Sequence, residues 1–213
     1  MRSVRVFVLL AIAFGVVPRA LSQPRSMPQV TLRAWNAGPV APWSLHDARH
    51  TAGRIMSSAG IALAWYSCGS ADRPGSLPLT RLSSHPVCFE QPAMAEFSVR
   101  LSPVPGRGSG GEELGYAWID ASEGAGTMAT VFVDRVESLA QAARIDPRTL
   151  LGRTVAHELG HLLLGTTGHA ERGLMRSRWT IDQLRARRDD DWQFTASEAQ
   201  TMRAKLGRHR AGR

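Results

Sequence analysis

The amino-acid sequence predicts a single α+β domain, with a small, mixed and twisted β-sheet and with helices in the C-terminal part of the chain. Three observations predict this class. Residues 29–66 have a strand–helix–strand pattern, strand-like segments recur between residues 97 and 133, and helical patterns fill residues 134–206. Strands that come first and helices that come later are typical of α+β proteins. About 190 residues outside a short leader are enough for one domain with its own core.

The first unit predicts a parallel strand pair. Residues 29–35 alternate polar and apolar side chains, and residues 61–66 form a short apolar run. Between them, residues 44–58 have apolar side chains at helical spacing, with Ser44 placed to cap the start and Gly60 to end the helix. Strands joined by a helix pair in parallel, with a right-handed crossover.

A loop rich in Gly, Pro and Ser follows at residues 67–95 and contains the only two cysteines, Cys68 and Cys88. An oxidising compartment would pair them in a disulfide. The loop closed is about 20 residues long, which the chain-entropy description values at about 3 kcal/mol. A metal site built on these two thiols would lack further ligands.

Three more strands are expected after this loop, at residues 97–101, 114–120 and 129–133. The last is apolar and is expected to lie inside the sheet. Asp134 is then placed to cap a helix that ends near Ala143.

A long helix is expected over residues 147–164. Asp146 and Pro147 are a favourable N-cap and first-turn residue, and Gly165 is placed for a left-handed C-cap. Apolar residues recur along it at helical spacing: Leu150, Leu151, Val155, Leu159, Leu162 and Leu163.

This helix contains the motif His157-Glu158-Leu159-Gly160-His161. Residues four apart lie on one helix face, so His157 and His161 can direct two imidazole nitrogens at one zinc ion. Glu158 lies about 100° around the helix from His157, which is a poor place for a third ligand. It can instead hold and deprotonate a water molecule at the metal.

A catalytic zinc ion usually has three protein ligands. His169 is the candidate for the third, because the glycines of residues 165–168 allow the chain to turn back sharply. Glu171 and Glu198 are alternative oxygen ligands, although Glu198 also completes a capping box with Thr195 at the start of the last helix.

The run HELGHLLLGTTGH, followed by GLM, resembles the metzincin metallopeptidases, and most of all their matrixin-type branch. Their motif places a glycine and a third histidine after the first pair and a methionine in a tight turn below the metal. This chain departs from it, because three residues rather than two separate His161 from Gly165 and Gly165 from His169. The resemblance implies these roles: metal ligands His157, His161 and His169, general base Glu158, and Met-turn residue Met175.

The resemblance also implies a zincin-like fold, one catalytic Zn²⁺, and a peptide or protein substrate. In such peptidases an edge strand before the metal helix pairs with the extended substrate. The candidate strand residues here are Leu114, Gly115, Tyr116, Ala117 and Trp118. The alternative interpretation is that these residues form an ordinary strand of the sheet that does not bind substrate.

Residues 1–22 have the features of a signal peptide: basic Arg2 and Arg5, an apolar run over residues 6–17, and small residues near Ser22. The apolar run is short for a membrane span, so a soluble exported protein is expected, with an uncleaved anchor as the alternative. The domain is expected over residues 23–207, with a basic disordered tail at residues 208–213.

The net charge of +8 comes from the two ends of the chain, because residues 23–202 carry 18 basic and 18 acidic side chains. A nucleic-acid partner is therefore not expected. The expected function is a secreted zinc-dependent metalloendopeptidase that uses a Glu-activated water at zinc. The alternatives are a secreted zinc-binding domain without activity and a metal-free binding module.

Overall fold

The computed structural model describes residues 27–37, 40, 42–69, 85–103, 112–186 and 188–211. The expected signal peptide and much of the loop between the cysteines lie outside these ranges. Among the described residues, no helix is long and apolar enough to cross a membrane.

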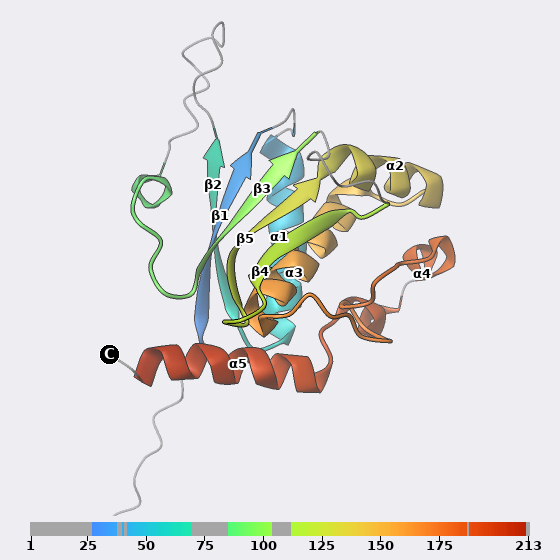
Figure 1. The fold of residues 1–213 in the computed structure, drawn as a ribbon. Coiled ribbons are helices and arrows are strands. Elements are labelled where there is room, and N and C mark those ends of the chain that lie inside the picture. The colour runs from blue at the N-terminus through green and yellow to red at the C-terminus, as the bar shows by residue number, and fades with distance from the viewer. Residues whose placement is uncertain are drawn as a thin grey trace, which may run out of the picture.

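One five-stranded mixed sheet has the strand order β2-β1-β3-β5-β4 (Figure 1). Strand β1 pairs in parallel with β2 and β3, and β3 pairs in parallel with β5. Strand β4 pairs antiparallel with β5 and forms one edge. The parallel pair around the first helix and the interior position of the 129–133 segment are thus confirmed. The strands are β1 (Gln29–Asn36), β2 (Ala62–Gly69), β3 (Glu96–Ser102), β4 (Gly115–Asp120) and β5 (Ala125–Phe132).

Helices α1 and α3 cover one face of this sheet (Figure 1). They approach closely at Gly152, where a Cβ atom would lie 2.5 Å from the Ala48 carbonyl oxygen. Buried aliphatic side chains of the strands, such as Leu32 and Val131, pack with Leu159 in the core between the layers. The helices are α1 (Pro42–Ser58), α2 (Val133–Ala143), α3 (Pro147–Leu164), α4 (Ile181–Arg185) and α5 (Ala196–Ala211).

The predicted disulfide is present between Cys68 and Cys88, whose Cα atoms lie 5.7 Å apart. It holds the segment before β3 against β2, with Cys88 at the end of the short 3₁₀ helix η2 (Pro86–Cys88). The buried Arg33 side chain of β1 also binds this segment, by donating to the Glu90 carbonyl oxygen at 2.6 Å, and it forms an ion pair at 2.6 Å with Glu96 at the start of β3. The disulfide and the Arg33–Glu90 hydrogen bond therefore hold the segment against the sheet.

Two predicted helix starts are wrong by one or two residues. Helix α1 begins at Pro42, so Ser44 lies inside its first turn. Helix α2 follows β5 directly, with Phe132 at the N-cap position and no side-chain cap. Asp134 lies in the first turn of α2, where its negative charge interacts favourably with the helix dipole although its side chain does not cap the helix.

The structure also corrects the expected disordered tail at residues 208–213. Helix α5 continues through Gly207 to Ala211, so residues 208–211 are helical. Gly207 has open space around its Cα, and an exposed glycine in a helix costs only about 1 kcal/mol relative to alanine. The predicted capping box at the start of α5 is confirmed, since Thr195 N donates to Glu198 and Glu198 N donates to Thr195 Oγ1.

Candidate metal centre

Helix α3 has the bounds that the sequence predicts, and local contacts explain both ends. The Asp146 carboxylate accepts hydrogen bonds from the backbone N–H groups of Arg148 and Thr149. At the other end Gly165 is left-handed, with φ 63°, and its N–H donates to the His161 carbonyl oxygen at 2.8 Å. The chain therefore leaves the helix one turn after His161 and doubles back over it.

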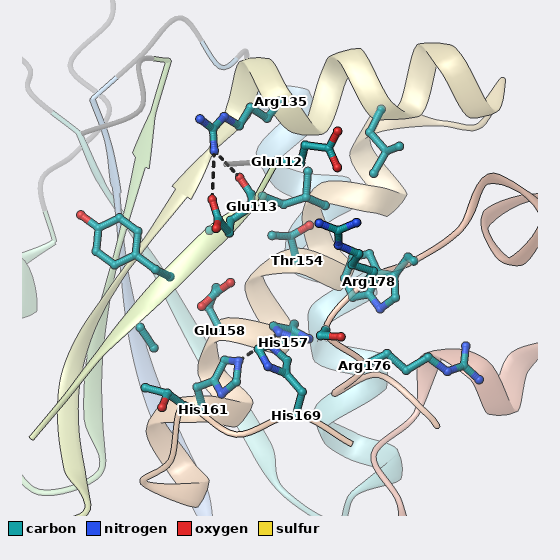
Figure 2. Close-up of a pocket in the computed structure, with 18 of the residues that line it drawn as sticks. Glu112, Glu113, Arg135, Thr154, His157, Glu158, His161, His169, Arg176 and Arg178 are labelled. Atoms are coloured by element: carbon teal, nitrogen blue, oxygen red, sulfur yellow. Dashed lines mark hydrogen bonds and ion pairs between the residues drawn. The ribbon is translucent and has the colours of Figure 1, made fainter. Parts of the chain in front are cut away.

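The structure brings His157, His161 and His169 together (Figure 2). Their candidate ligand atoms all lie within 4.8 Å of one another, and the Nε2 atoms of His157 and His161 lie 3.0 Å apart. The His169 ring centre lies 5.4 Å from that of His157 and 4.8 Å from that of His161. The longer spacing on each side of Gly165 thus still lets the third imidazole reach the first two.

Two backbone carbonyl groups orient the helical imidazoles. The Nδ1 atoms of His157 and His161 each lie 2.8 Å from a carbonyl oxygen, that of Leu174 and that of Thr166 respectively. A carbonyl oxygen can only accept, so each Nδ1 carries the proton and each Nε2 keeps its lone pair. This is the arrangement that a metal-binding histidine needs.

All three imidazoles favour the neutral form. Burial, with a further contribution from His161, lowers the pKa of His157 to about 3. Burial also lowers the pKa values of His161 and His169, against an opposing contribution from the Thr166 carbonyl at His161. Metal ions bind neutral imidazole, so no proton has to leave these rings at neutral pH.

The Glu158 carboxylate lies beside the histidines in the space between α3 and β4 (Figure 2). The residue is only 4% exposed, its Oε2 has no hydrogen-bond partner among the described residues, and burial raises its pKa to about 8. Gly115 of β4 faces it, and a Cβ there would lie 2.7 Å from Glu158 Oε1. A carboxyl group whose pKa lies near the working pH is suited both to accept and to return a proton.

Met175 lies in a tight turn directly beneath the histidine-bearing part of α3. It is 1% exposed, and a Cβ on Gly160 would lie 2.6 Å from its sulfur atom. The turn is closed by the Ala170 N–H, which donates to the Met175 carbonyl oxygen at 2.8 Å. Gly160 lies between His157 and His161 in the motif, so Met175 supports the helix at that point.

A cavity of about 900 Å³ opens from the histidines along the edge strand. Leu114, Gly115, Tyr116 and Ala117 line it, whereas Trp118 does not and is 57% exposed. Leu114 lies just before β4, and its carbonyl oxygen accepts a hydrogen bond from Phe132 N. The far edge of β4 has no strand partner among the described residues, so its backbone is available for pairing.

The two alternative oxygen ligands lie apart from the histidine cluster. Within the described part of the chain, the group able to hold a metal contains three histidines and neither Glu171 nor Glu198. The Glu198 carboxylate accepts from Thr195 N at 2.7 Å, so it serves as a helix cap.

Three features of the site are absent from the sequence prediction. The Leu174 and Thr166 carbonyl groups orient the histidines, but every residue has a carbonyl group, so no sequence signal marks them. Trp179 packs edge-on against His157, with ring centres 5.5 Å apart. Arg178 lines the cavity. Both follow the Met175 turn closely, which is the one signal that points to them.

Comparison with known proteins identifies the fold. Neither a protein-family model nor a curated protein sequence matches the chain. Among solved structures, archaemetzincin from Methanopyrus kandleri matches with a TM-score of 0.53 and 16% identity, over 86% of this chain and 98% of that one. Metalloproteinase-II from Bacteroides fragilis matches with a TM-score of 0.54 and 14% identity, over 86% of this chain.

The match to the Bacteroides fragilis protein covers 55% of its length, so this chain corresponds to about half of that protein. At these identities the likeness concerns the path of the backbone. The predicted α+β, zincin-like fold is confirmed: the chain has the same fold as archaemetzincin, with a mixed sheet packed on a histidine-bearing helix.

Proposed function

We propose that this protein is a secreted zinc-dependent metalloendopeptidase. One observation carries the proposal: three neutral imidazoles meet beside a buried carboxylate that has a free oxygen, within a cavity that runs along an open strand edge. The fold shared with archaemetzincin and with a metalloproteinase agrees with it.

The donor set suits zinc. His157, His161 and His169 would hold the ion through ring nitrogens, and three neutral nitrogen donors with room for one more ligand are typical of catalytic zinc. Carbonyl oxygens already fix the tautomers of the two helical histidines. Calcium and magnesium prefer oxygen ligands, which this cluster does not supply.

Zinc bound there would polarise the peptide carbonyl group and lower the pKa of a coordinated water towards 7. Glu158 accepts a proton from the attacking water while the water oxygen forms a bond to the peptide carbonyl carbon. As the C–N bond breaks, Glu158 returns that proton to the leaving amine nitrogen. Its burial and its unpartnered Oε2 suit this transfer, because the carboxylate has no competing hydrogen bond to break.

The substrate would bind as an extra strand along the open edge of β4. Main-chain hydrogen bonds would give affinity there, and alternate side chains would enter the cavity. Gly115 lies beside Glu158. The strand residues on either side of Gly115 also line the cavity: Leu114 before it, and Tyr116 and Ala117 after it. Substrate residues on both sides of the scissile bond can therefore pair, which favours cleavage of internal bonds.

Export and the closer family relationship belong to the same proposal. The signal-like residues 1–22 and the Cys68–Cys88 disulfide both suit an oxidising, extracytoplasmic compartment. The chain resembles the matrixin-type motif over about 20 residues. We propose that the protein is a metzincin in which the spacing on each side of Gly165 is one residue longer.

The decisive experiment combines metal analysis with peptide hydrolysis. Purified mature protein should contain one zinc ion per chain and should cleave internal bonds in an unbiased peptide library. The Glu158→Gln variant should keep its zinc and lose at least about 100-fold in turnover. Zinc without Glu158-dependent cleavage would indicate the non-catalytic zinc-binding domain, and protein without zinc would reject both.

A further inference from the structure

The cavity continues past Glu158 towards the N-terminal end of α3, and its wall there contains an arginine that has no partner among the described residues. Thr154, one helical turn before Glu158, lines this part, and so does Arg178 from the segment after the Met175 turn. Figure 2 shows the Arg178 side chain extending from that segment towards Thr154. The next residue, Trp179, contacts the His157 ring, so Arg178 lies close to the metal centre.

The other two arginines that line the cavity have partners. Arg135 donates to the Glu113 carbonyl oxygen at 2.8 Å and lies 3.7 Å from its carboxylate. Arg176 forms an ion pair with Asp191 at 2.7 Å. Arg178, by contrast, makes no hydrogen bond or ion pair with any residue that the structure describes. Its five N–H donors are therefore available to a ligand in the cavity.

We propose that Arg178 makes this peptidase selective for a carboxylate on the substrate residue next to the scissile bond. The proposal rests on the function proposed above. Thr154 and Glu158 are four residues apart on α3, which is about 6 Å along the helix axis. A side chain one residue from the reacting carbonyl group spans that distance, so a substrate carboxylate can reach the guanidinium. A planar guanidinium binds a carboxylate through two parallel hydrogen bonds.

Acidic side chains in the same cavity sharpen the test. Glu112 and Asp134 line its wall near α2, and they would attract a basic substrate residue instead. Asp134 lies in the first turn of α2, where the helix dipole offsets part of its charge. A preference for lysine or arginine at the residue beside the cleaved bond would therefore assign the pocket to these acids and overturn the proposal.

The experiment uses pairs of internally quenched peptides that differ only by Glu or Gln at each residue flanking the cleaved bond. The parent protein should favour Glu about tenfold in kcat/KM at one of these positions. Arg178→Gln should bring that ratio close to one, and Arg178→Glu should invert it, so that the Gln peptide is favoured over the Glu peptide. Arg172 is an exposed arginine six residues earlier that does not line the cavity, so Arg172→Gln should keep the parent ratio.

A second readout does not depend on turnover. Zinc-loaded Glu158→Gln protein should bind the Glu peptide more tightly than the Gln peptide, and adding Arg178→Gln should remove the difference. A further pair of peptides ends at the residue next to the scissile bond, with either a free or an amidated C-terminus. Comparing their binding shows whether Arg178 recognises a C-terminal carboxylate as well as a side-chain carboxylate. A Glu-to-Gln ratio that Arg178→Gln leaves unchanged in both assays would overturn the assignment, whereas absence of Glu158-dependent hydrolysis would overturn the proposed function alone.

Discussion

Gly115 of the edge strand and Glu158 of the long helix are in contact only because residue 115 has no side chain. A Cβ atom there would lie 2.7 Å from Glu158 Oε1 and 2.7 Å from the Thr130 carbonyl oxygen. The glycine thus lets the strand lie directly against the carboxylate, so the proposed substrate strand would lie beside the proposed proton acceptor.

Gly115→Ala is expected to lower kcat/KM by at least about tenfold, because the methyl group must displace either the carboxylate or the strand. Zinc content should stay at one per chain, since no histidine contacts the added atom. Gly53→Ala is a suitable control: it makes the same change on α1, where a Cβ meets nothing within 4 Å. Loss of zinc in Gly115→Ala, or unchanged kinetics, would contradict the assigned role of this glycine.

Gly160→Ala should destabilise the fold by about 1–3 kcal/mol, because a Cβ there would lie 2.6 Å from both the Met175 sulfur and Phe194 Cε1. Urea unfolding of the zinc-free protein measures this cost apart from metal binding. Gly207→Ala, on the exposed side of α5, should instead stabilise the fold by up to about 1 kcal/mol. Equal effects from the two substitutions would mean that Met175 does not pack tightly under the helix.

The elements that the sequence predicts best are those with local signals. The bounds of α3 follow from Asp146, which caps its own helix, and from Gly165, whose left-handed conformation ends it. The end of α5 shows the limit of such signals. Gly207 has open surroundings, and nothing there forces a left-handed turn, so the helix continues past it.

Features that depend on contacts between residues far apart in the chain could not be predicted from the sequence. The pair His157 and His161 follows from helical spacing, and the turn back of His169 follows from the glycines before it. The order of the strands does not, because β5 separates β3 from β4 through contacts between segments far apart in the chain. Likewise, the sequence does not indicate that Arg178 lines the cavity, because its position depends on the turn at Met175.

The Asp146 cap predicts a pH-dependent contribution to stability. Burial opposes ionisation of Asp146, but hydrogen bonds from Arg148 and Thr149 outweigh it and hold the pKa below 3.8. Because folding lowers this pKa, the stabilisation is present above about pH 4 and is lost as the pH falls through the folded value. Asp146→Ala should cost about 1 kcal/mol at pH 7, as judged by urea unfolding.

The difference between parent and Asp146→Ala should then shrink as the pH falls below 3.8. A gap that is the same at pH 3 and pH 7 would show that the charge of the cap makes no contribution. The neighbouring ion pair of Arg148 with Asp47 can be removed with Asp47→Asn as a control. This change should leave most of the cap contribution in place, because the two side chains are 38% and 44% exposed and solvent screens their charges.

His169 provides the most direct test of the longer motif spacing. His169→Ala should weaken zinc binding by more than about 100-fold, since loss of a partner that merely orients a ligand already costs 10–100-fold. His50→Ala, an exposed histidine on α1, should bind zinc like the parent. Competition against a chelator of known affinity measures both variants without any assay of turnover. If His169→Ala keeps parental affinity, the metal is held by His157 and His161 with some other group, and the extra residues around Gly165 have moved the third histidine out of the coordination sphere.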